Sequence, residues 1–332
     1  MTRFFLGVDV GATKSHALVA NESGQALGFA EGGPGNPFSI GNAAFAEVLQ
    51  TIAHEALGSA GIHRSQIAGA GFGIGGYDWP SQRKPILQAI HTLGLSGPVE
   101  IVNDALIALL AGTSKGWGVA VVAGTSCNCW GWDQNRRTGQ MTGFSWLGEA
   151  AGSQELVIKA LQAVALEWTR RGPPTRLTQA FVELTRTRDT ADFLEGLTLE
   201  RLQLGPEAAP IVFQVAAEGD PVANELILWA GRELASLVLG VIHQLNLEAQ
   251  TFDVILAGSF FYGSPVLAET LGQVIHPVAS GAQLVRLYVP PVVGGVLLGM
   301  ETGGLNVSPI REALIRSTDV LLAQARGTRS TA

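Results

Sequence analysis

The chain has 332 residues, of which 47% are apolar and 15% are charged, and its formal net charge is −7 at pH 7. This composition allows large buried cores and argues against disorder, and the length favours two domains over one. The negative charge, together with the lack of a long basic run, makes nucleic acid and anionic membranes unsuitable partners.

The chain opens with an apolar run, Phe4–Val10, which a short turn joins to a second apolar run over residues 17–20. This pattern predicts a β-hairpin. Asp9 stands out, because a carboxylate late in a buried strand is costly unless it is paired or bound to a cation. The turn adds a glycine, a hydroxyl and a cation, namely Gly11, Thr13 and Lys14. These groups suit a phosphate with a metal ion near Asp9; a surface hairpin whose Asp caps its own turn is the alternative.

Strand and helix patterns alternate after the hairpin. A third strand is predicted over residues 26–31, a helix over residues 45–57 and a glycine-rich strand over Ile67–Ile74, which ends in a Gly-Gly turn. Asn36 lies between a glycine and a proline in the loop before the helix. It presents its amide to a ligand or forms an Asx-type turn, and both interpretations have equal weight.

A carboxylate follows the next predicted strand. The strand Val99–Asn103 runs directly into Asp104 and a helix over residues 105–111. Ligands of open α/β sheets bind at such strand ends, which makes Asp104 a candidate binding or catalytic residue. Asp is also a good N-cap, and the cap is the favoured role when this stretch is considered alone.

A second hairpin repeats the design of the first. The strands over residues 117–123 and Cys127–Trp132 flank the turn Gly124-Thr125-Ser126. Two hairpins of this kind, each opening a block of α/β pattern, indicate an internal duplication. The two cysteines of the chain, Cys127 and Cys129, are not expected to form a mutual disulfide, which favours a reducing cytosol.

The remaining chain predicts further α/β structure. Helices are predicted over residues 153–170, 210–218, 221–247, 264–275 and 309–325, two short helices over 177–199, and strands over Phe252–Ala257 and 284–289. The six histidines have no metal-ligand spacing. Trp130 and Trp132 are expected to pack within their strand rather than to form a sugar platform.

Several motifs occur in a specific order, namely Asp9-Val10-Gly11-Ala12-Thr13-Lys14, Asn103-Asp104-Ala105, Ala123-Gly124-Thr125 with Asn128, Ala257-Gly258-Ser259 and Pro290-Pro291-Val292-Val293-Gly294. In this order the chain resembles the actin/hexokinase/Hsp70-like ATPase superfamily. Within it, the chain resembles the BadF/BadG/BcrA/BcrD ATPase family and its N-acetylglucosamine-kinase-like members. The resemblance implies an α/β fold of two ribonuclease-H-like (actin-like ATPase) domains that flank a nucleotide cleft. Residues 1–112, joined by the helix 309–325, would form one domain and residues 116–305 the other.

The resemblance also implies the site. ATP and its phosphates would be bound by Asp9, Gly11, Thr13, Lys14, Gly124, Thr125, Gly258 and Ser259, with Mg²⁺ near Asp9, directly or through water. The sugar would be bound by Asn36, Gly75, Gly76, Asn128, Gly143 and Glu149, with Thr125 also facing it. Asp104 would be the general base that accepts the proton of the attacking hydroxyl.

The chain departs from the family pattern at two places. The second hairpin reads Gly124-Thr125-Ser126-Cys127 where the kinases usually have Gly-Thr-Gly-Ser. The acidic pair of the kinases' Gly-Asp-Glu-Gly-Ser loop falls on Ala150 and Ala151 when the sequences are aligned without gaps, with Glu149 as the nearest acid. The kinases use that Asp on the sugar, so the change bears on the identity of the substrate.

The leading hypothesis is a cytoplasmic sugar kinase, expected to be a homodimer, that phosphorylates N-acetylglucosamine or a related amino sugar with ATP. One alternative is a non-catalytic sensor of sugar or nucleotide on the same fold. The other is an ATP-driven redox activator, which would hold an iron–sulfur cluster through cysteines at a dimer interface. Cys127 and Cys129 are badly placed for that role, because they lie in the hairpin expected to contact phosphate.

Overall fold

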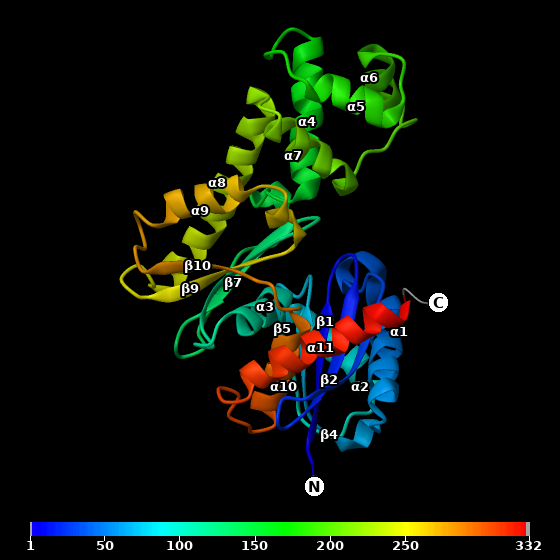
Figure 1. The fold of residues 1–332 in the computed structure, drawn as a ribbon, viewed down its shortest axis with the longest axis vertical. Coiled ribbons are helices and arrows are strands. Elements are labelled where there is room, and N and C mark those ends of the chain that lie inside the picture. The colour runs from blue at the N-terminus through cyan, green and yellow to red at the C-terminus, as the bar shows by residue number, and fades with distance from the viewer. Residues whose placement is uncertain (1, 330–332) are drawn as a thin grey trace.

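The computed structural model describes residues 2–329 and contains two five-stranded sheets. The first has the strand order β3-β2-β1-β4-β5 and the second β10-β9-β6-β7-β8. Each sheet forms its own lobe of an elongated molecule, with the N-terminal and C-terminal segments in the same lobe (Figure 1). The predicted α/β class is therefore confirmed.

The first sheet is formed by the opening hairpin and the strands that follow it. Its strands are β1 (Phe4–Val10), β2 (Ser15–Asn21), β3 (Ala26–Gly32), β4 (Ile67–Ile74) and β5 (Val99–Asn103). β2 pairs antiparallel with both β1 and β3, whereas β4 pairs parallel with both β1 and β5. Both β1 and β4 are nearly continuous apolar runs, as expected for strands that are covered on both faces.

The second sheet repeats this topology. Its strands are β6 (Gly118–Ala123), β7 (Cys127–Trp132), β8 (Thr138–Gln140), β9 (Phe252–Ala257) and β10 (Ala282–Arg286). The β6–β7–β8 part is antiparallel, and β9 and β10 run parallel to β6. The strand order therefore matches that of the first sheet, and the internal duplication is confirmed. The last strand begins and ends earlier than the predicted range of 284–289.

Two groups of helices cover the first sheet. α1 (Pro37–Ala60) contacts β2 and β3 and is followed by α2 (Arg83–His91). On the other face, α10 (Val292–Thr302) contacts β1 and β4 so closely that a Cβ on Gly71 would lie 2.3 Å from the Gly295 carbonyl oxygen. The final helix, α11 (Arg311–Arg329), contacts β3. α10 thus packs on the first sheet, although the predicted boundary at residue 305 groups it with the second.

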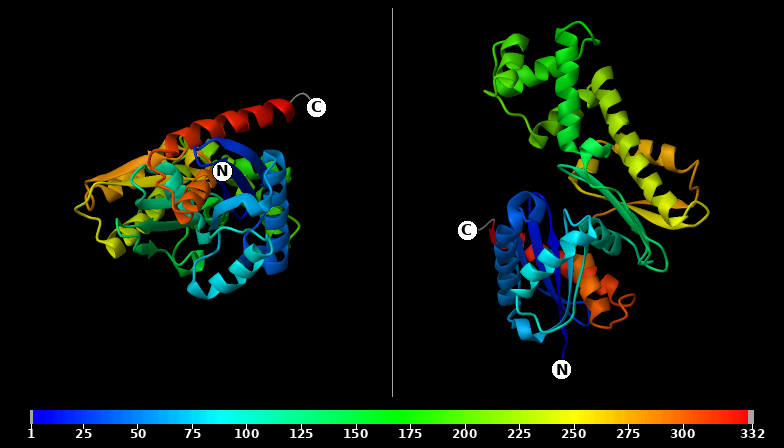
Figure 2. Two further views of the ribbon diagram at one scale, coloured as in Figure 1. Left: turned by 90° about the horizontal axis from the view of Figure 1, so that it is seen from below. Right: turned by 180° about the vertical axis from the view of Figure 1, so that it is seen from behind.

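The second lobe contains the helices between residues 153 and 275. They are α4 (Ser153–Trp168), α5 (Leu177–Thr185), α6 (Thr190–Thr198), α7 (Ala209–Ala217), α8 (Pro221–Leu245) and α9 (Pro265–Ile275). Short 3-10 helices lie at Arg64–Gln66, Pro80–Gln82, Ser145–Leu147, Pro206–Ala208 and Ser259–Tyr262. Helices α4 to α7 extend away from the first lobe (Figure 2).

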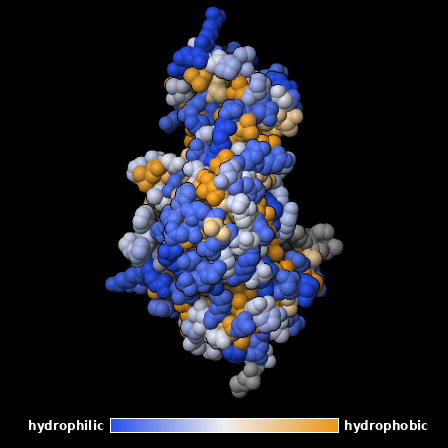
Figure 3. All heavy atoms as spheres, turned by 90° about the vertical axis from the view of Figure 1, so that its left-hand side faces the viewer, coloured by the Kyte–Doolittle hydropathy of each residue, from blue (hydrophilic) through white to orange (hydrophobic). Residues whose placement is uncertain are grey.

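Helix α8 is the one described helix long and apolar enough to cross a bilayer by length and composition, and half of its most apolar window is buried. It packs against α9 and β7, and its inner face belongs to the core of the second lobe. The side of the molecule seen in Figure 3 is largely hydrophilic, with apolar side chains in separate small groups. The apolar face of α8 is therefore used within the protein.

Helix α3 (Asp104–Gly112) lies between the two sheets. It contacts α10 on one side and β6, β7 and β9 on the other. Its apolar residues share a buried cluster with Trp130, Trp132 and Ile255 of the second sheet, which confirms that both tryptophans pack inside. Because α3 begins at the pocket described below, this packing fixes the position of its first residue.

Candidate active site

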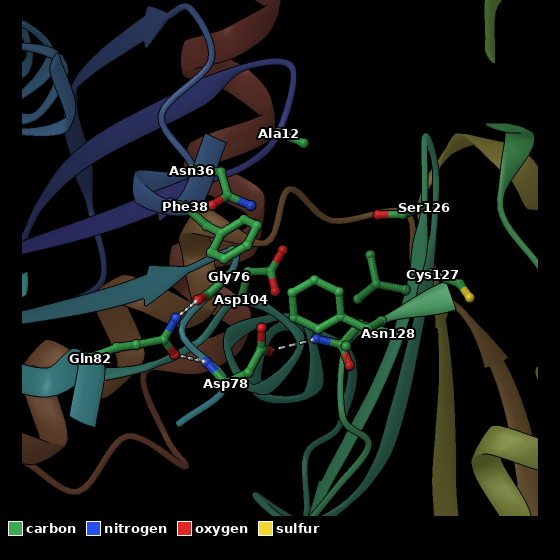
Figure 4. A pocket seen from close by; sticks show the side chains of 14 residues that line it. Ala12, Asn36, Phe38, Gly76, Asp78, Gln82, Asp104, Ser126, Cys127 and Asn128 are labelled. Carbon is green, nitrogen blue, oxygen red and sulfur yellow. Dashed lines mark hydrogen bonds between the residues drawn. The ribbon is translucent and has the colours of Figure 1, made fainter. Parts of the chain in front are cut away.

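A pocket of about 150 Å³ lies where the two lobes meet (Figure 4). Both lobes contribute to it. Its lining residues are Ala12, Asn36, Phe38, Gly75, Gly76, Asp78, Gln82 and Asp104 from the first part of the chain, and Val122, Ser126, Cys127, Asn128, Gly143 and Phe144 from the second. Ala12 and Ser126, one from each hairpin turn, lie near the same end of it (Figure 4).

Asp104 is the first residue of α3, and its carboxylate lines the pocket. The N-cap is Asn103, whose Oδ1 accepts a hydrogen bond from the Ala105 N–H at 3.0 Å. The cap interpretation of Asp104 is therefore wrong, because its neighbour already fills that role. Burial, and then the nearby charges of Asp9 and Asp78, raise the pKa of Asp104 from 3.8 to about 7. A carboxyl group with this pKa is well suited to accept a proton near neutral pH.

The predicted sugar-side residues largely converge on the pocket. Asn36, Gly75, Gly76, Asn128 and Gly143 all line it. Asn36 also caps α1, since its Oδ1 accepts from the Phe38 N–H at 2.9 Å, so the turn interpretation is confirmed and the contact with a ligand stays a prediction. A glycine is required at position 76, where φ is +82° and a Cβ would lie 2.4 Å from the Asn36 Oδ1.

Glu149 does not line the pocket. Its carboxylate accepts the backbone N–H groups of Thr142 at 2.6 Å and Gly143 at 2.5 Å, which holds the loop before the 3-10 helix Ser145–Leu147 in shape. Ala151 is fully buried. Glu149 is consequently a residue that positions Gly143, and the predicted direct contact with sugar has no support in the geometry.

Asp78 is a pocket residue to which the sequence analysis assigned no role. It follows the Gly75-Gly76 turn, is 8% exposed, and its Oδ1 accepts from Asn103 Nδ2 at 3.0 Å and from Asn128 Nδ2 at 3.3 Å. Burial raises its pKa from 3.8 to about 6, and the charge of Glu149 adds to this rise. The signal that could have found it is the one that pointed to Asp104, a carboxylate just after a strand end.

Two aromatic side chains, Phe38 and Phe144, line the pocket and were also missed; Trp146 packs behind Phe144. The ring of Phe144 lies 5.4 Å from Phe38 and 6.3 Å from Trp146, in edge-to-face contacts. Phe38 belongs to α1 and Phe144 to the loop of the other lobe, so the rings meet across the cleft. Apolar rings of this kind can pack against the C–H face of a sugar.

The predicted phosphate-side residues lie on the two turns. In the first turn the Gly11 N–H donates to the Lys14 carbonyl at 3.0 Å, and both Thr13 and Lys14 are exposed. In the second, the Gly124 N–H donates to the Ser126 carbonyl at 2.9 Å. These turns leave hydroxyl, ammonium and backbone groups available to a polyphosphate.

Gly258 and Ser259 follow β9 at the same end of the second sheet. Gly258 has a φ of +99°, and a Cβ on it would lie 2.1 Å from the Ala123 carbonyl oxygen. The residue thus sits directly beside the end of β6, next to the second turn. The backbone at this position can therefore approach a ligand bound between the hairpins.

The carboxylates of the site fit a magnesium ion. Asp9 lies at the end of β1 with its Oδ2 3.6 Å from His16 Nδ1, and its charge acts on Asp104. Among residues 2–329 there is no cluster of three His, Cys, Asp or Glu side chains placed to hold a metal. Mg²⁺ bound near Asp9 would therefore take most of its ligands from phosphate and water, as it commonly does.

The repeated sheets, the two turns and the carboxylates between them define a nucleotide-cleft protein of the actin-like ATPase fold. The model of the BadF/BadG/BcrA/BcrD ATPase family matches residues 6–299, and the chain belongs to this family. The resemblance stated from the sequence is thereby confirmed.

Two curated relatives are similar over most of their length. The chain is 26% identical to the N-acetylmuramic acid/N-acetylglucosamine kinase of Clostridium acetobutylicum, over 77% of this chain and 85% of that protein. It is 25% identical to the N-acetyl-D-glucosamine kinase of Dictyostelium discoideum, over 90% of this chain and 98% of that protein.

Solved structures share the fold. A protein from Chromobacterium violaceum, described as a candidate N-acetylglucosamine kinase, has a TM-score of 0.68 and 21% identity, with 89% of this chain and 98% of that chain covered. A ROK family glucokinase from Streptomyces griseus, solved with glucose and AMPPNP, has a TM-score of 0.59 and 17% identity, with 90% of this chain and 99% of that chain covered. The predicted two-domain actin-like ATPase fold is confirmed.

Proposed function

We propose that the protein is a kinase that transfers the γ-phosphoryl group of ATP to a hydroxyl of an amino sugar, with N-acetylglucosamine as the preferred acceptor. The observation that carries this proposal is the position of Asp104. Its carboxylate lies in a pocket lined by both lobes and faced by both hairpin turns, with a pKa of about 7. The names of both curated relatives support the same acceptor.

The proposed reaction consists of one proton transfer and one phosphoryl transfer. The acceptor hydroxyl gives its proton to the Asp104 carboxylate while its oxygen bonds to the γ-phosphorus, and the bond between that phosphorus and the bridging oxygen of ADP breaks. A general base of this kind typically contributes about 10²- to 10⁴-fold to the rate. Most of the remaining acceleration comes from alignment of the two substrates.

We propose the following residues for the nucleotide: Asp9, Gly11, Thr13 and Lys14 on the first turn, Gly124 and Thr125 on the second, and Gly258 with Ser259 toward the adenosine. Lys14 would supply a positive charge to the phosphates, and the turn N–H groups would donate hydrogen bonds to them. Mg²⁺ bound near Asp9 would neutralise charge that develops on the transferred phosphoryl group.

We propose that the two lobes act as domains that close on the sugar, with the predicted ranges 1–112 and 116–305 amended at one helix. Because α10 packs on the first sheet, its residues 292–302 are assigned to the first domain together with the helix at 309–325. Closure would exclude water from the γ-phosphate. We further propose that the enzyme works in the cytoplasm as a homodimer, without nucleic acid or membrane partners.

The redox activator has little support from the cysteines. Both are free, and Cys127 is 6% and Cys129 0% exposed. Both belong to the core on one face of β7, and burial raises the pKa of each thiol. Thiols in this environment would have to leave the core before they could bind iron at a subunit interface.

The test is ADP release measured with a panel of sugars, namely N-acetylglucosamine, glucosamine, N-acetylmannosamine, glucose and N-acetylmuramic acid. We expect turnover with N-acetylglucosamine to be the fastest. If calorimetry shows that sugar and ATP bind but no sugar is phosphorylated, the sensor hypothesis replaces the kinase.

A further inference from the structure

The loop over residues 142–151 gives this pocket no carboxylate. It ends in two alanines, Ala150 and Ala151, and Ala151 is fully buried. The nearest acid, Glu149, is occupied by the N–H groups of Thr142 and Gly143. A sugar in the pocket would therefore meet only the backbone and the aromatic rings of this loop.

Asp78 lies against Gly143 of this loop but belongs to a turn of the other lobe, and that turn is held in place by hydrogen bonds. The Gln82 side chain closes the turn around it: its Oε1 accepts from the backbone N–H groups of Asp78 at 2.8 Å and Trp79 at 2.7 Å, and its Nε2 donates to the Gly76 carbonyl at 2.9 Å. Figure 4 shows Gln82 on the turn and the Asp78 carboxylate turned into the pocket. With its backbone fixed in this way and its Oδ1 held by Asn103 and Asn128, Asp78 needs little ordering when a ligand arrives.

One oxygen of this carboxylate is available. Oδ1 accepts from Asn103 and Asn128, whereas Oδ2 has no hydrogen-bond partner within the described part of the chain. Oδ2 faces the Cα of Gly143, where a Cβ would lie 2.9 Å away. The residue as a whole is 8% exposed, but Oδ2 is not one of the fully buried unpaired polar atoms, so a donor in the pocket can reach it. The hydroxyl and amide groups of an amino sugar are donors of the required kind.

The charge of the pocket also limits its ligands. Two of the described lining residues, Asp78 and Asp104, are carboxylates, and none of the described lining residues is Lys, Arg or His. A carboxylate on the sugar would find two like charges in a poorly solvated space and no counter-charge. Such an arrangement selects against anionic acceptors.

We propose that Asp78 is a sugar-binding residue that supplies the acceptor site with its second carboxylate, and that with it the site selects uncharged amino sugars over anionic ones. The inference rests on the proposed function and adds a residue and a substrate class to it. Asp104 accepts the proton of the acceptor hydroxyl, whereas Asp78 binds the sugar and favours uncharged sugars over anionic ones.

The test compares Asp78→Asn with Asp104→Asn and with Asp133→Asn as the matched control. Asn at position 78 keeps an oxygen for Asn103 and Asn128, so the turn and the contact between lobes survive. Asp133 lies beyond the far end of β7, and its Oδ1 accepts the N–H groups of Asn135 and Arg137, which Asn can also do. Each variant is assayed for kcat and KM at about pH 8, and its affinity for N-acetylglucosamine is measured by calorimetry without nucleotide.

We expect Asp78→Asn to raise the KM and the Kd for N-acetylglucosamine about 10- to 100-fold, with kcat changed by less than about threefold. Asp104→Asn should instead lower kcat, and Asp133→Asn should leave kcat, KM and Kd unchanged. The wild-type protein should prefer N-acetylglucosamine to N-acetylmuramic acid, whose lactyl group carries a carboxylate, by about 10-fold or more in kcat/KM. Asp78→Asn should shrink that preference, which a merely structural role for Asp78 would not do.

An Asp78→Asn variant with unchanged KM, Kd and preference would overturn the inference and leave the kinase proposal standing. Equal use of both sugars by the wild-type protein would overturn the charge selection without any variant. If the wild-type protein neither binds nor phosphorylates any amino sugar, the proposed function fails and the inference fails with it.

Discussion

Replacement of Asp104 by Asn is expected to stabilise the free protein while it removes activity. The carboxyl group has a pKa of about 7 in the folded protein against 3.8 for an unperturbed Asp. The folded state therefore holds this proton more tightly than the unfolded state, so the free energy of unfolding falls as pH rises from about 4 to about 7 and stays low above that.

The size of the effect follows from the pKa. A rise of about three pKa units corresponds to about 4 kcal/mol at pH values above 7, since each unit is worth about 1.4 kcal/mol. This value is an upper bound, because Asp104 is partly exposed to the pocket and Asn is itself a polar group. We expect a gain of about 1 to 3 kcal/mol at about pH 8, and a smaller gain at about pH 5, where the folded protein already holds the proton.

The assay is urea denaturation of both proteins at the two pH values, with phosphoryl transfer measured alongside. As a general base Asp104 should be worth about 10²-fold or more in kcat. Asp133→Asn is the control, and its effect on the free energy of unfolding should have the opposite sign. Hydrogen bonds from Arg137 and Asn135 outweigh burial and lower the pKa of Asp133, so its replacement should destabilise the protein at about pH 8. An Asp104→Asn variant that is less stable at about pH 8, or that keeps near wild-type kcat, would refute the reasoning.

Four further outcomes are expected. The kcat/KM for sugar should fall about tenfold per pH unit below about pH 7, as Asp104 takes up its proton; a flat profile between about pH 5 and 8 would contradict a base with this pKa. Asn103→Ala should lower the free energy of unfolding by about 1 kcal/mol, since it removes the cap of α3, and an unchanged urea midpoint would argue against that assignment. Asp9→Asn should weaken ATP binding and its dependence on Mg²⁺ in calorimetry, and identical isotherms would remove Asp9 from the metal site. Glu149→Gln should raise the KM for sugar several-fold with little change in stability, because the loop that presents Gly143 loosens; an unaltered KM would show that the loop keeps its shape without this charge.

The parts of the fold and site that sequence analysis predicted are those with local signals. The two hairpins and the strand end at Asp104 depend on short apolar runs, glycine turns and one carboxylate, all within a few residues of one another. The resemblance to a known family depends on the order of these same motifs along the chain, so the sequence alone is enough to reveal it.

The parts that were missed depend on contacts between distant segments. Asn103 and Asp104 are equally good caps in a sequence, and only the backbone geometry at the start of α3 decides between them. Asp78 gains its importance from Asn128, 50 residues later in the chain. The assignment of α10 to the first sheet depends on glycines of β4 that allow two backbones to approach, which no local pattern reveals.

The path of the chain between the two sheets limits how the lobes can move. The chain leaves the first sheet through α3 and the segment 113–117, and it returns from β10 to α10 through the segment 287–291. Two connections at separate points define a hinge axis between the lobes. The two connections would resist twisting and sliding of one lobe against the other. Rotation of the lobes about the axis through both connections would be the least restricted motion. Asn36 belongs to one lobe and Asn128 to the other, so a rotation of this kind would change the distance between these two pocket residues.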